Sequence, residues 1–208
     1  MNPIYVHYGC GLFAPKGWRN FDGSPTLRLQ RLPLIGHAFQ TEGFPSFPPN
    51  VEFGDIVRGL PLRPGECRGI YCSHVLEHLA LKDLRIALAN TYKLLEPGGT
   101  FRFVLPDLEQ LINEYCNASN SDAALSFMRH SGLGVEQRSR GVIPMIRFWF
   151  GNSSHLWMWD FKAIRAELER VSFRKIRRAQ FGDAADVYFK EVENAERWQN
   201  CLGVECMK

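Results

Sequence analysis

Two short segments carry side chains that could do chemistry near the ends of expected strands. In the first, YGCG, an apolar run leads into a two-glycine turn, and a carboxylate, Asp22, follows Gly11 by 11 residues. The second, SHVLEH, places His74, Glu77 and His78 within one helical turn. A turn without side chains lets backbone N–H groups approach a ligand closely, and a carboxylate beside a histidine can orient it as a base. The residues therefore predict a ligand site that combines backbone donors with acid–base side chains.

The glycine turn departs from the dinucleotide-binding fingerprint. That fingerprint reads G-x-G-x-x-G, opens a helix and reaches its acidic residue about 20 residues later. Here Phe13, Ala14 and Pro15 stand where the third glycine and the helix would begin. Pro15 and Gly17 leave room for a turn at most, because proline lacks the backbone donor of a helix interior. An NAD-dependent oxidoreductase is therefore the weaker interpretation.

Length and composition indicate one globular α/β domain. The chain has 208 residues, of which 45% are apolar and 23% charged. No apolar run reaches the roughly 18 residues that span a bilayer, and the N-terminus lacks a signal-peptide pattern. The net charge of +3 does not require a polyanionic partner, and the basic run 173–181 alternates like a strand at a sheet edge. We therefore expect a cytoplasmic protein without a membrane span or a nucleic-acid partner.

The six cysteines and the histidine-rich segment do not predict a metal site. No two cysteines form a C-x-x-C pair, so free buried thiols in a reducing compartment are expected. The letters HVLEH, residues 74–78, also match the inverted zincin motif H-x-x-E-H. That motif needs a long helix and a remote third ligand, whereas this segment follows a strand at once. We therefore expect no metal.

The order of elements predicts an α/β fold. Apolar runs alternate with helical patterns, which is typical of a largely parallel sheet with helices on its faces. One helix is expected over LKDLRIALANTYKLL and ends at Pro97-Gly98-Gly99, and two others begin after the N-caps Asp107 and Asp160. The helix that begins after Asp107 is expected to bury Leu108, Leu111, Ile112 and Tyr115 on one face. The strand-like runs are 4–8, 19–22, 51–53, 69–73, 100–107, 174–181 and 201–207.

Four segments in this order resemble one family: YGCGLFAPKGWRNFDGSP, YCSHVLEHL, YKLLEPGGTFRFVLPDLEQL and HLWMWDFKAIRAELERVSF. Together they resemble the class I S-adenosylmethionine-dependent methyltransferases, and more narrowly the small bacterial type 11 group. The resemblance implies a Rossmann-like, seven-stranded, mostly parallel sheet with helices on both faces and an antiparallel last strand. It also implies a single domain over residues 1–208, with irregular insertions near 24–50 and 117–155 that shape a substrate pocket.

The same resemblance implies a binding site for S-adenosyl-L-methionine. The glycine loop would lie under the methionyl part of the cofactor, Asp22 would accept the ribose hydroxyls, and Asp55 would lie near the adenine. An Asx-turn before Gly23 is the structural alternative for Asp22. The expected cofactor-binding residues are Tyr8, Gly9, Cys10, Gly11, Asp22, Asp55, Ser73 and His74.

Three residues are candidates for a catalytic base, which a hydroxyl acceptor needs because its pKa is high. They are His74, Asp107 and His155. Each has a structural alternative: His74 could secure its loop, Asp107 could only cap a helix, and His155 precedes Trp157 and Trp159, which suit either a core or a sugar-stacking face.

Methyl transfer to the hydroxyl of a small molecule or sugar is the function that the resemblance implies. Surface polysaccharide or glycan metabolism is the expected setting. A non-catalytic binding protein of the same fold is the alternative, because Cys67-Arg68 replaces the Phe-Asp pair common in relatives and the glycine loop is short. Nucleic-acid methylation would need a basic face or an N-P-P-Y type motif, which FPPN does not supply. The sequence leaves the acceptor and the oligomeric state open.

Overall fold

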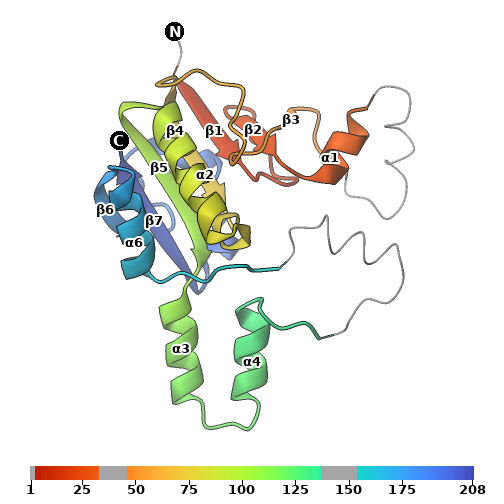
Figure 1. Cartoon of the computed structure of the whole chain (residues 1–208), viewed down its shortest axis with the longest axis vertical. Coiled ribbons are helices and arrows are strands. Elements are labelled where there is room, and N and C mark those ends of the chain that lie inside the picture. Colours follow the sequence, from red (N-terminus) through yellow and green to blue (C-terminus); the bar gives the residue numbers. More distant parts are fainter. Residues whose placement is uncertain (1–2, 33–45, 137–153) are drawn as a thin grey trace.

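The predicted strands form one seven-stranded sheet. The computed structural model describes residues 3–32, 46–136 and 154–208. Its strands are β1 Ile4–Tyr8, β2 Arg19–Asp22, β3 Val51–Phe53, β4 Cys67–Ser73, β5 Leu95–Pro106, β6 Arg174–Ala179 and β7 Cys201–Met207. They are ordered β3-β2-β1-β4-β5-β7-β6 (Figure 1). The strands from β3 to β5 run parallel, and β7 is antiparallel to both neighbours, so the predicted fold class is confirmed.

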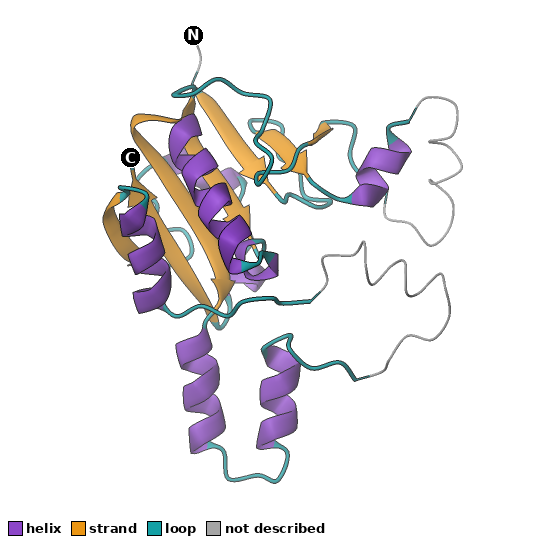
Figure 2. Ribbon diagram, viewed as in Figure 1, coloured by secondary structure: helices purple, strands orange, loops and turns teal. Residues whose placement is uncertain are grey.

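Helices cover both faces of the sheet: α-helices pack on one face and short 3₁₀ helices on the other. Alternate residues of β5 point to opposite faces. Phe101, Phe103 and Leu105 pack with α2 (Leu81–Leu94) and α6 (Phe161–Arg170), which lie in front of the sheet in Figure 2. On the other face, Val104 packs with Phe189 and Trp198. These aromatic residues belong to the single-turn 3₁₀ helices η3 (Val187–Glu191) and η4 (Ala195–Trp198).

The helix α2 ends earlier than the sequence predicts. Its last residue is Leu94, and Leu95 is already extended and part of β5. The expected stop at Pro97-Gly98-Gly99 is therefore wrong. A Cβ on Gly99 would lie 3.1 Å from the carbonyl oxygens of Cys67 and Arg68. The glycine thus permits the close approach of β5 to β4, rather than ending a helix.

The helices α3 (Leu108–Asn117) and α4 (Ala123–His130) extend beyond the sheet side by side (Figures 1 and 2). Asp107 caps α3 as predicted, by accepting a hydrogen bond from Glu109 N at 3.0 Å. The predicted buried face of α3 is only partly right: Leu111 is buried, but Ile112 and Tyr115 are exposed. The reason is that α3 packs on α4 and not on the sheet.

The two stretches expected to be irregular contain short helices. One of them is α4. The other is α1 (Pro25–Gln30), which is capped by Ser24 and has Pro25 in its first turn, where proline is tolerated. The remaining expectations for these insertions fall on 33–45 and 137–153, which lie outside the described residues.

Most cysteines are buried and free, as expected, although Cys116 is exposed and Cys201 half-buried. In the part of the chain that the structure describes, no helix has both the length and the apolar character to cross a membrane.

Candidate active site

The glycine loop lies where three parallel strands end. Because β1 neighbours β2 and β4 in the sheet, their carboxyl ends meet at one edge. Cys10 N donates a hydrogen bond to Phe21 O of β2 at 3.1 Å. On the other side Gly9 packs against Val75, so closely that a Cβ on this residue would overlap the valine side chain. The loop is thus held between the ends of β2 and β4 without a helix after it, as the sequence predicts.

Asp22 ties this loop to the end of β2. Its Oδ2 accepts a hydrogen bond from Gly11 N at 2.8 Å, and its Oδ1 accepts one from Ser24 N at 2.8 Å. The Asx-turn alternative is therefore present, and the carboxylate also orders the glycine loop. Each carboxylate oxygen can accept more than one hydrogen bond, so both remain able to accept ligand hydroxyls.

Asp55 lies beside Asp22, as a ribose and adenine pair of acids would require. Gly54 N donates to Asp22 O at 3.1 Å, and Gly23 lies next to the Asp55 backbone. The Asp55 side chain is half-exposed; its Oδ1 accepts a hydrogen bond from Val57 N at 2.9 Å.

Several features of this edge fit a nucleoside ligand with a charged amino-acid tail. Gly9 and Gly11 adopt left-handed φ values of 64° and 55°, and a Cβ on Gly11 would meet nothing within 4 Å. The backbone of the loop is therefore open to a ligand. Ser73 Oγ, at the end of β4, is buried near Tyr71 and makes no hydrogen bond of good geometry with the described residues. A buried hydroxyl without a partner is rare and suits a ligand atom.

Tyr8 and Cys10 contribute only their main chain to this edge. The Tyr8 side chain is buried in the core, where Thr91 Oγ1 lies 3.5 Å from its hydroxyl. The Cys10 side chain packs with Leu27 and Val51, and burial raises the pKa of its thiol to about 12. Neither side chain is placed to touch a ligand in the loop.

His74 has an unusual backbone and several partners. Its φ of 54° lies in the left-handed region, which is costly for a residue with a Cβ. Nε2 lies 3.0 Å from Arg197 O, and Nδ1 lies 3.2 Å from Glu77 Oε1. Burial by itself lowers the pKa of His74, but its contacts with Cys201, Glu77 and the Arg197 carbonyl outweigh burial and raise it to about 10. Such a histidine is positively charged at neutral pH, which does not suit a proton acceptor.

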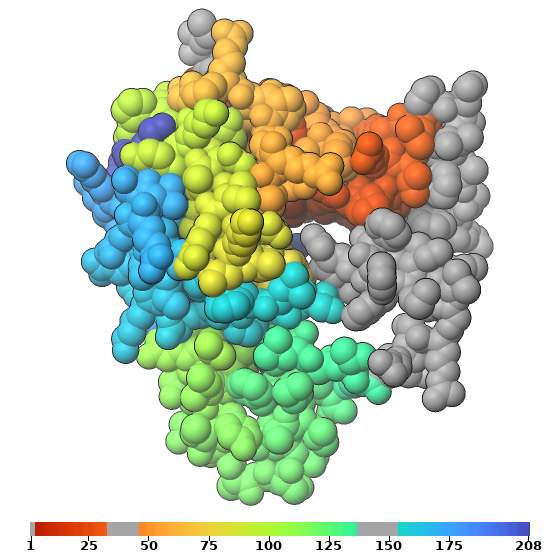
Figure 3. Space-filling view, viewed as in Figure 1, coloured from red at the N-terminus to blue at the C-terminus, as the bar shows by residue number. Residues whose placement is uncertain are grey.

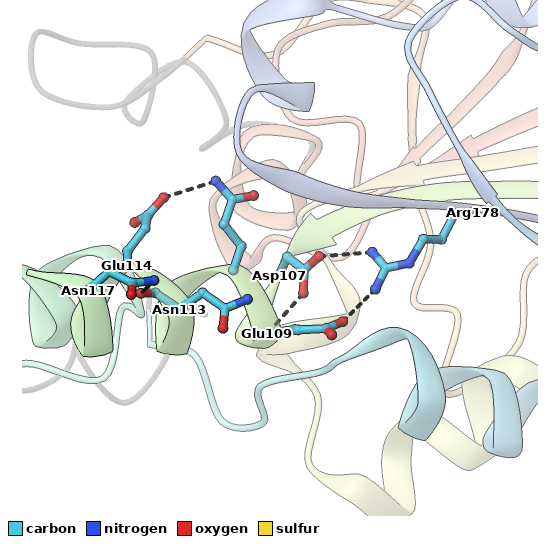
Figure 4. Close-up of a pocket in the computed structure, with 7 residues that line it drawn as sticks. Asp107, Glu109, Asn113, Glu114, Asn117 and Arg178 are labelled. Atoms are coloured by element: carbon cyan, nitrogen blue, oxygen red, sulfur yellow. Dashed lines mark hydrogen bonds and ion pairs between the residues drawn. The ribbon is translucent and has the colours of Figure 1, made fainter.

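The Asp107 side chain contacts the N-terminus of α3 and Arg178 of β6. Besides capping the helix, its carboxylate lies 3.1 Å from Arg178 Nη1, while Arg178 Nη2 binds Glu109 at 2.7 Å. These residues line a pocket of about 550 Å³ along α3 (Figure 4). The glycine loop does not line this pocket. The other lining residues are Gln110, Asn113, Glu114 and Asn117.

His155 comes from the segment 154–160, which lies against η2 (Leu76–His78), the cyan and yellow atoms of Figure 3. Leu156 N and Trp157 N both donate to Glu77 O, at 2.8 and 3.1 Å. These bonds bring the His155 ring to 4.9 Å from the His78 ring, centroid to centroid. The sequence predicted His155 as a site residue, but it did not predict that this residue meets the SHVLEH segment.

Comparison with known proteins shows which domain part of this chain resembles. Residues 36–103, about a third of the chain, match the family model described as a methyltransferase domain. These residues therefore resemble a type 11 methyltransferase domain. The match supports an S-adenosylmethionine-dependent methyltransferase, with S-adenosyl-L-methionine as its cofactor. The glycine loop and Asp22 precede the matched residues, so their assignment depends on the geometry above.

Solved structures share the fold of this methyltransferase at low identity. A possible histamine N-methyltransferase from Thermotoga maritima has a TM-score of 0.56 at 13% identity, over 100% of this chain and 83% of that one. A methyltransferase from Archaeoglobus fulgidus has a TM-score of 0.51 at 16% identity, over 99% and 86%. A Haloferax volcanii putative methyltransferase, solved with its Trm112 activator, has a TM-score of 0.50 at 16% identity, over 99% and 82%. No curated protein sequence matches the chain.

Proposed function

We propose that this methyltransferase transfers the methyl group of S-adenosyl-L-methionine to a hydroxyl of a small molecule or sugar. The observation that carries the proposal is the meeting of the glycine loop, Asp22 and the end of β4 at one edge, next to the histidines of η2 and segment 154–160. The first group suits the cofactor. The second suits an acceptor whose proton must be removed.

The cofactor part of the proposal assigns a role to each element of the edge. The open backbone at Gly11 receives the methionyl end, and Asp22 with neighbouring Asp55 receives the ribose and adenine. Ser73 Oγ offers the unused hydroxyl. Because the sulfonium is an activated donor, the protein mainly aligns the two substrates and excludes water.

The acceptor part rests on the histidine pair. His155 Nδ1 lies 2.6 Å from Ser131 O, and His78 Nδ1 lies 3.1 Å from Ser154 O. A carbonyl only accepts, so both rings carry their proton on Nδ1 and present a free lone pair on Nε2. Trp157 follows nearby with a 43% exposed side chain, which supplies an aromatic face of the kind on which sugar rings stack. We therefore favour this pair over Asp107, whose carboxylate is already paired, as the place where the hydroxyl is activated.

Calorimetry with S-adenosylmethionine and S-adenosylhomocysteine tests the cofactor site. Asp22→Ala is expected to weaken binding by about 1–3 kcal/mol, the cost of losing a charge-assisted acceptor. Glu52→Ala is the matched control, because Glu52 is an exposed acid on the adjacent strand β3 and pairs with Arg19 at 2.7 Å. Wild-type affinity in Asp22→Ala would refute the ribose assignment. No binding to the unmodified protein would instead support a non-catalytic protein.

The acceptor class is tested by mass spectrometry after incubation with matched hydroxyl and amine acceptors, including saccharides. Methylation of hydroxyl acceptors, with a loss of turnover in His155→Ala, is the expected result. Methylation of amines alone would contradict the proposal.

A further inference from the structure

A cluster of three side chains near the proposed acceptor site has the composition of a metal centre. The donor atoms of Glu77, His78 and His155 all lie within 4.8 Å of one another. Two imidazoles and one carboxylate form a donor set typical of zinc and of other divalent transition ions. From this geometry we propose that Glu77, His78 and His155 bind a divalent transition-metal ion of the Zn²⁺ type.

The buried carboxylate of Glu77 is the first independent support. The residue is 1% exposed, and neither carboxylate oxygen accepts a hydrogen bond of good geometry from the described residues. Its nearest charged neighbour is His74, whose Nδ1 lies 3.2 Å from Oε1. The charged His74 ring balances the Glu77 charge in part, but Oε2 has no partner among the described residues, and a buried polar oxygen without a hydrogen bond is costly. A cation bound between the carboxylate and the two histidines removes this cost.

The orientation of the two histidines is the second support. Metal-binding histidines usually donate their other ring N–H to a backbone carbonyl or a carboxylate, which fixes the ring and directs the free lone pair at the ion. His78 and His155 both do so, toward Ser154 O and Ser131 O. This second shell comes from two separate segments, and it is in place in the fold as it stands.

A close contact with Gly132 also fixes the position of the His155 ring. Gly132, which follows α4, has a φ of 65°, and a Cβ at this position would overlap the His155 ring. Ligands of a bound ion, at about 2.0–2.1 Å from it, are about 3.4 Å apart in a tetrahedral site. The cluster would therefore contract by a little over 1 Å on binding, which side-chain rotation can supply.

This site differs from the inverted zincin motif that the letters HVLEH suggest. In that motif both histidines are ligands on one long helix. Here Glu77 and His78 lie on the single turn η2, His74 only flanks the carboxylate, and His155 completes the set from a distant segment. The sequence alone therefore led to the expectation of no metal, because the third ligand could not be seen.

The site suggests how the acceptor hydroxyl is activated, a step that rests on the proposed function. Three protein ligands leave at least one position open, and a hydroxyl bound there would release its proton to solvent water more readily. The ion would thus replace a histidine base.

Metal binding is tested without any methyl donor or acceptor, so that its failure is distinct from failure of methyl transfer. Full-length protein treated with chelator is titrated with Co²⁺, followed by visible absorption. We expect one saturable Co²⁺ per chain, displaced by one equivalent of Zn²⁺, without the near-ultraviolet band of a thiolate ligand. Absence of saturable binding, or a thiolate band, would overturn the site.

Variants test the ligands and their positioning, with folding checked by circular dichroism. His155→Ala and His78→Ala are expected to weaken Co²⁺ binding more than about 100-fold, since even the loss of a second-shell partner costs about 10–100-fold. His130→Ala, an exposed histidine of α4, is the control and should bind like the wild type. Unchanged affinity in both ligand variants would overturn the proposal.

Gly132→Ala should weaken Co²⁺ binding at least about tenfold, because the new methyl group displaces the His155 ring. Gly65→Ala is its matched control: Gly65 has a similar φ of 73°, but a Cβ there would meet nothing within 4 Å. Equal affinity in these two variants would contradict the positioning of His155.

Discussion

Two regions of this methyltransferase bury carboxylates, and they treat them in opposite ways. On the face covered by η3 and η4, the fully buried Arg102 binds Glu193 at 2.5 Å and both Glu205 and Asp183 at 2.9 Å. Its remaining nitrogen, Nη2, donates to Gln180 O at 2.6 Å. At the carboxyl edge, by contrast, Glu77 is as deeply buried but accepts no hydrogen bond of good geometry.

The difference lies in how many partners the fold gives to each buried carboxylate. The Arg102 centre satisfies its own charges, and its guanidinium also lies 4.7 Å from the Trp198 ring centroid. Such a centre holds β5, β7 and the 3₁₀ helices together. The Glu77 centre has only the His74 contact and leaves Oε2 without a partner among the described residues, while donor atoms of His78 and His155 lie within 4.8 Å of the carboxylate. An unsatisfied buried charge in a native structure calls for an explanation, and a ligand supplies one.

The largest effect is expected from breaking the satisfied centre. Arg102→Leu should lower the free energy of unfolding by about 3–5 kcal/mol, because it leaves buried acids without their partner. Urea denaturation measures the change. Arg165→Ala is the control, since Arg165 makes only an exposed pair with Glu169, and it should cost less than about 0.5 kcal/mol. A cost below about 1 kcal/mol for Arg102→Leu would show that the centre is not structural.

An intermediate effect separates the two carboxylates directly. In metal-free protein, Glu193→Gln should cost about 2 kcal/mol or more, because it weakens a buried ion pair and its Oε2 also accepts from Gly182 N. Glu77→Gln should cost less than Glu193→Gln, because Glu77 loses one contact, with His74 at 3.2 Å, whereas Glu193 has hydrogen bonds at both carboxylate oxygens. Chemical denaturation of both variants in chelator measures the difference. Equal costs would mean that Glu77 serves the fold in the same way as Glu193.

A pH-dependent effect concerns a third buried group, His7 of β1, which stays neutral in the folded protein. Burial, helped by the positive charge of Arg197, lowers the pKa of His7 to about 3. The unfolded chain takes up this proton near pH 6.5, so His7 stabilises the protein above that pH. This stability is lost as the pH falls from 6.5 toward 3, by about 1.4 kcal/mol per unit.

His7→Phe should therefore flatten the loss of stability on acidification. The measurement is urea denaturation of both proteins between pH 7 and pH 4.5. An unchanged slope would show that another group controls the acid sensitivity.

Local patterns in the sequence predicted the elements and a largely parallel sheet, whereas the seven-stranded sheet with an antiparallel last strand was implied by the family resemblance. Strand periods, the short loop between Gly11 and Arg19, and the caps Asp107 and Asp160 depend on neighbouring residues only, and the structure contains each of them. The end of α2 was missed because Gly99 responds to a tertiary contact, the close approach of β4. From the sequence alone, a glycine that ends a helix cannot be distinguished from one that allows two strands to approach closely.

The two buried charge centres show what the sequence could not decide. Arg102 lies in the alternating run TFRFVL, where an arginine reads as a solvent-facing residue. Only the packing of η3 and η4 buries it and brings its acidic partners from residues 183–205. In the same way, SHVLEH showed two donors, and the backbone bonds from Leu156 and Trp157 to Glu77 O bring the third. Sequence spacing fixes which residues share an element, whereas contacts between distant segments form only when the whole chain packs.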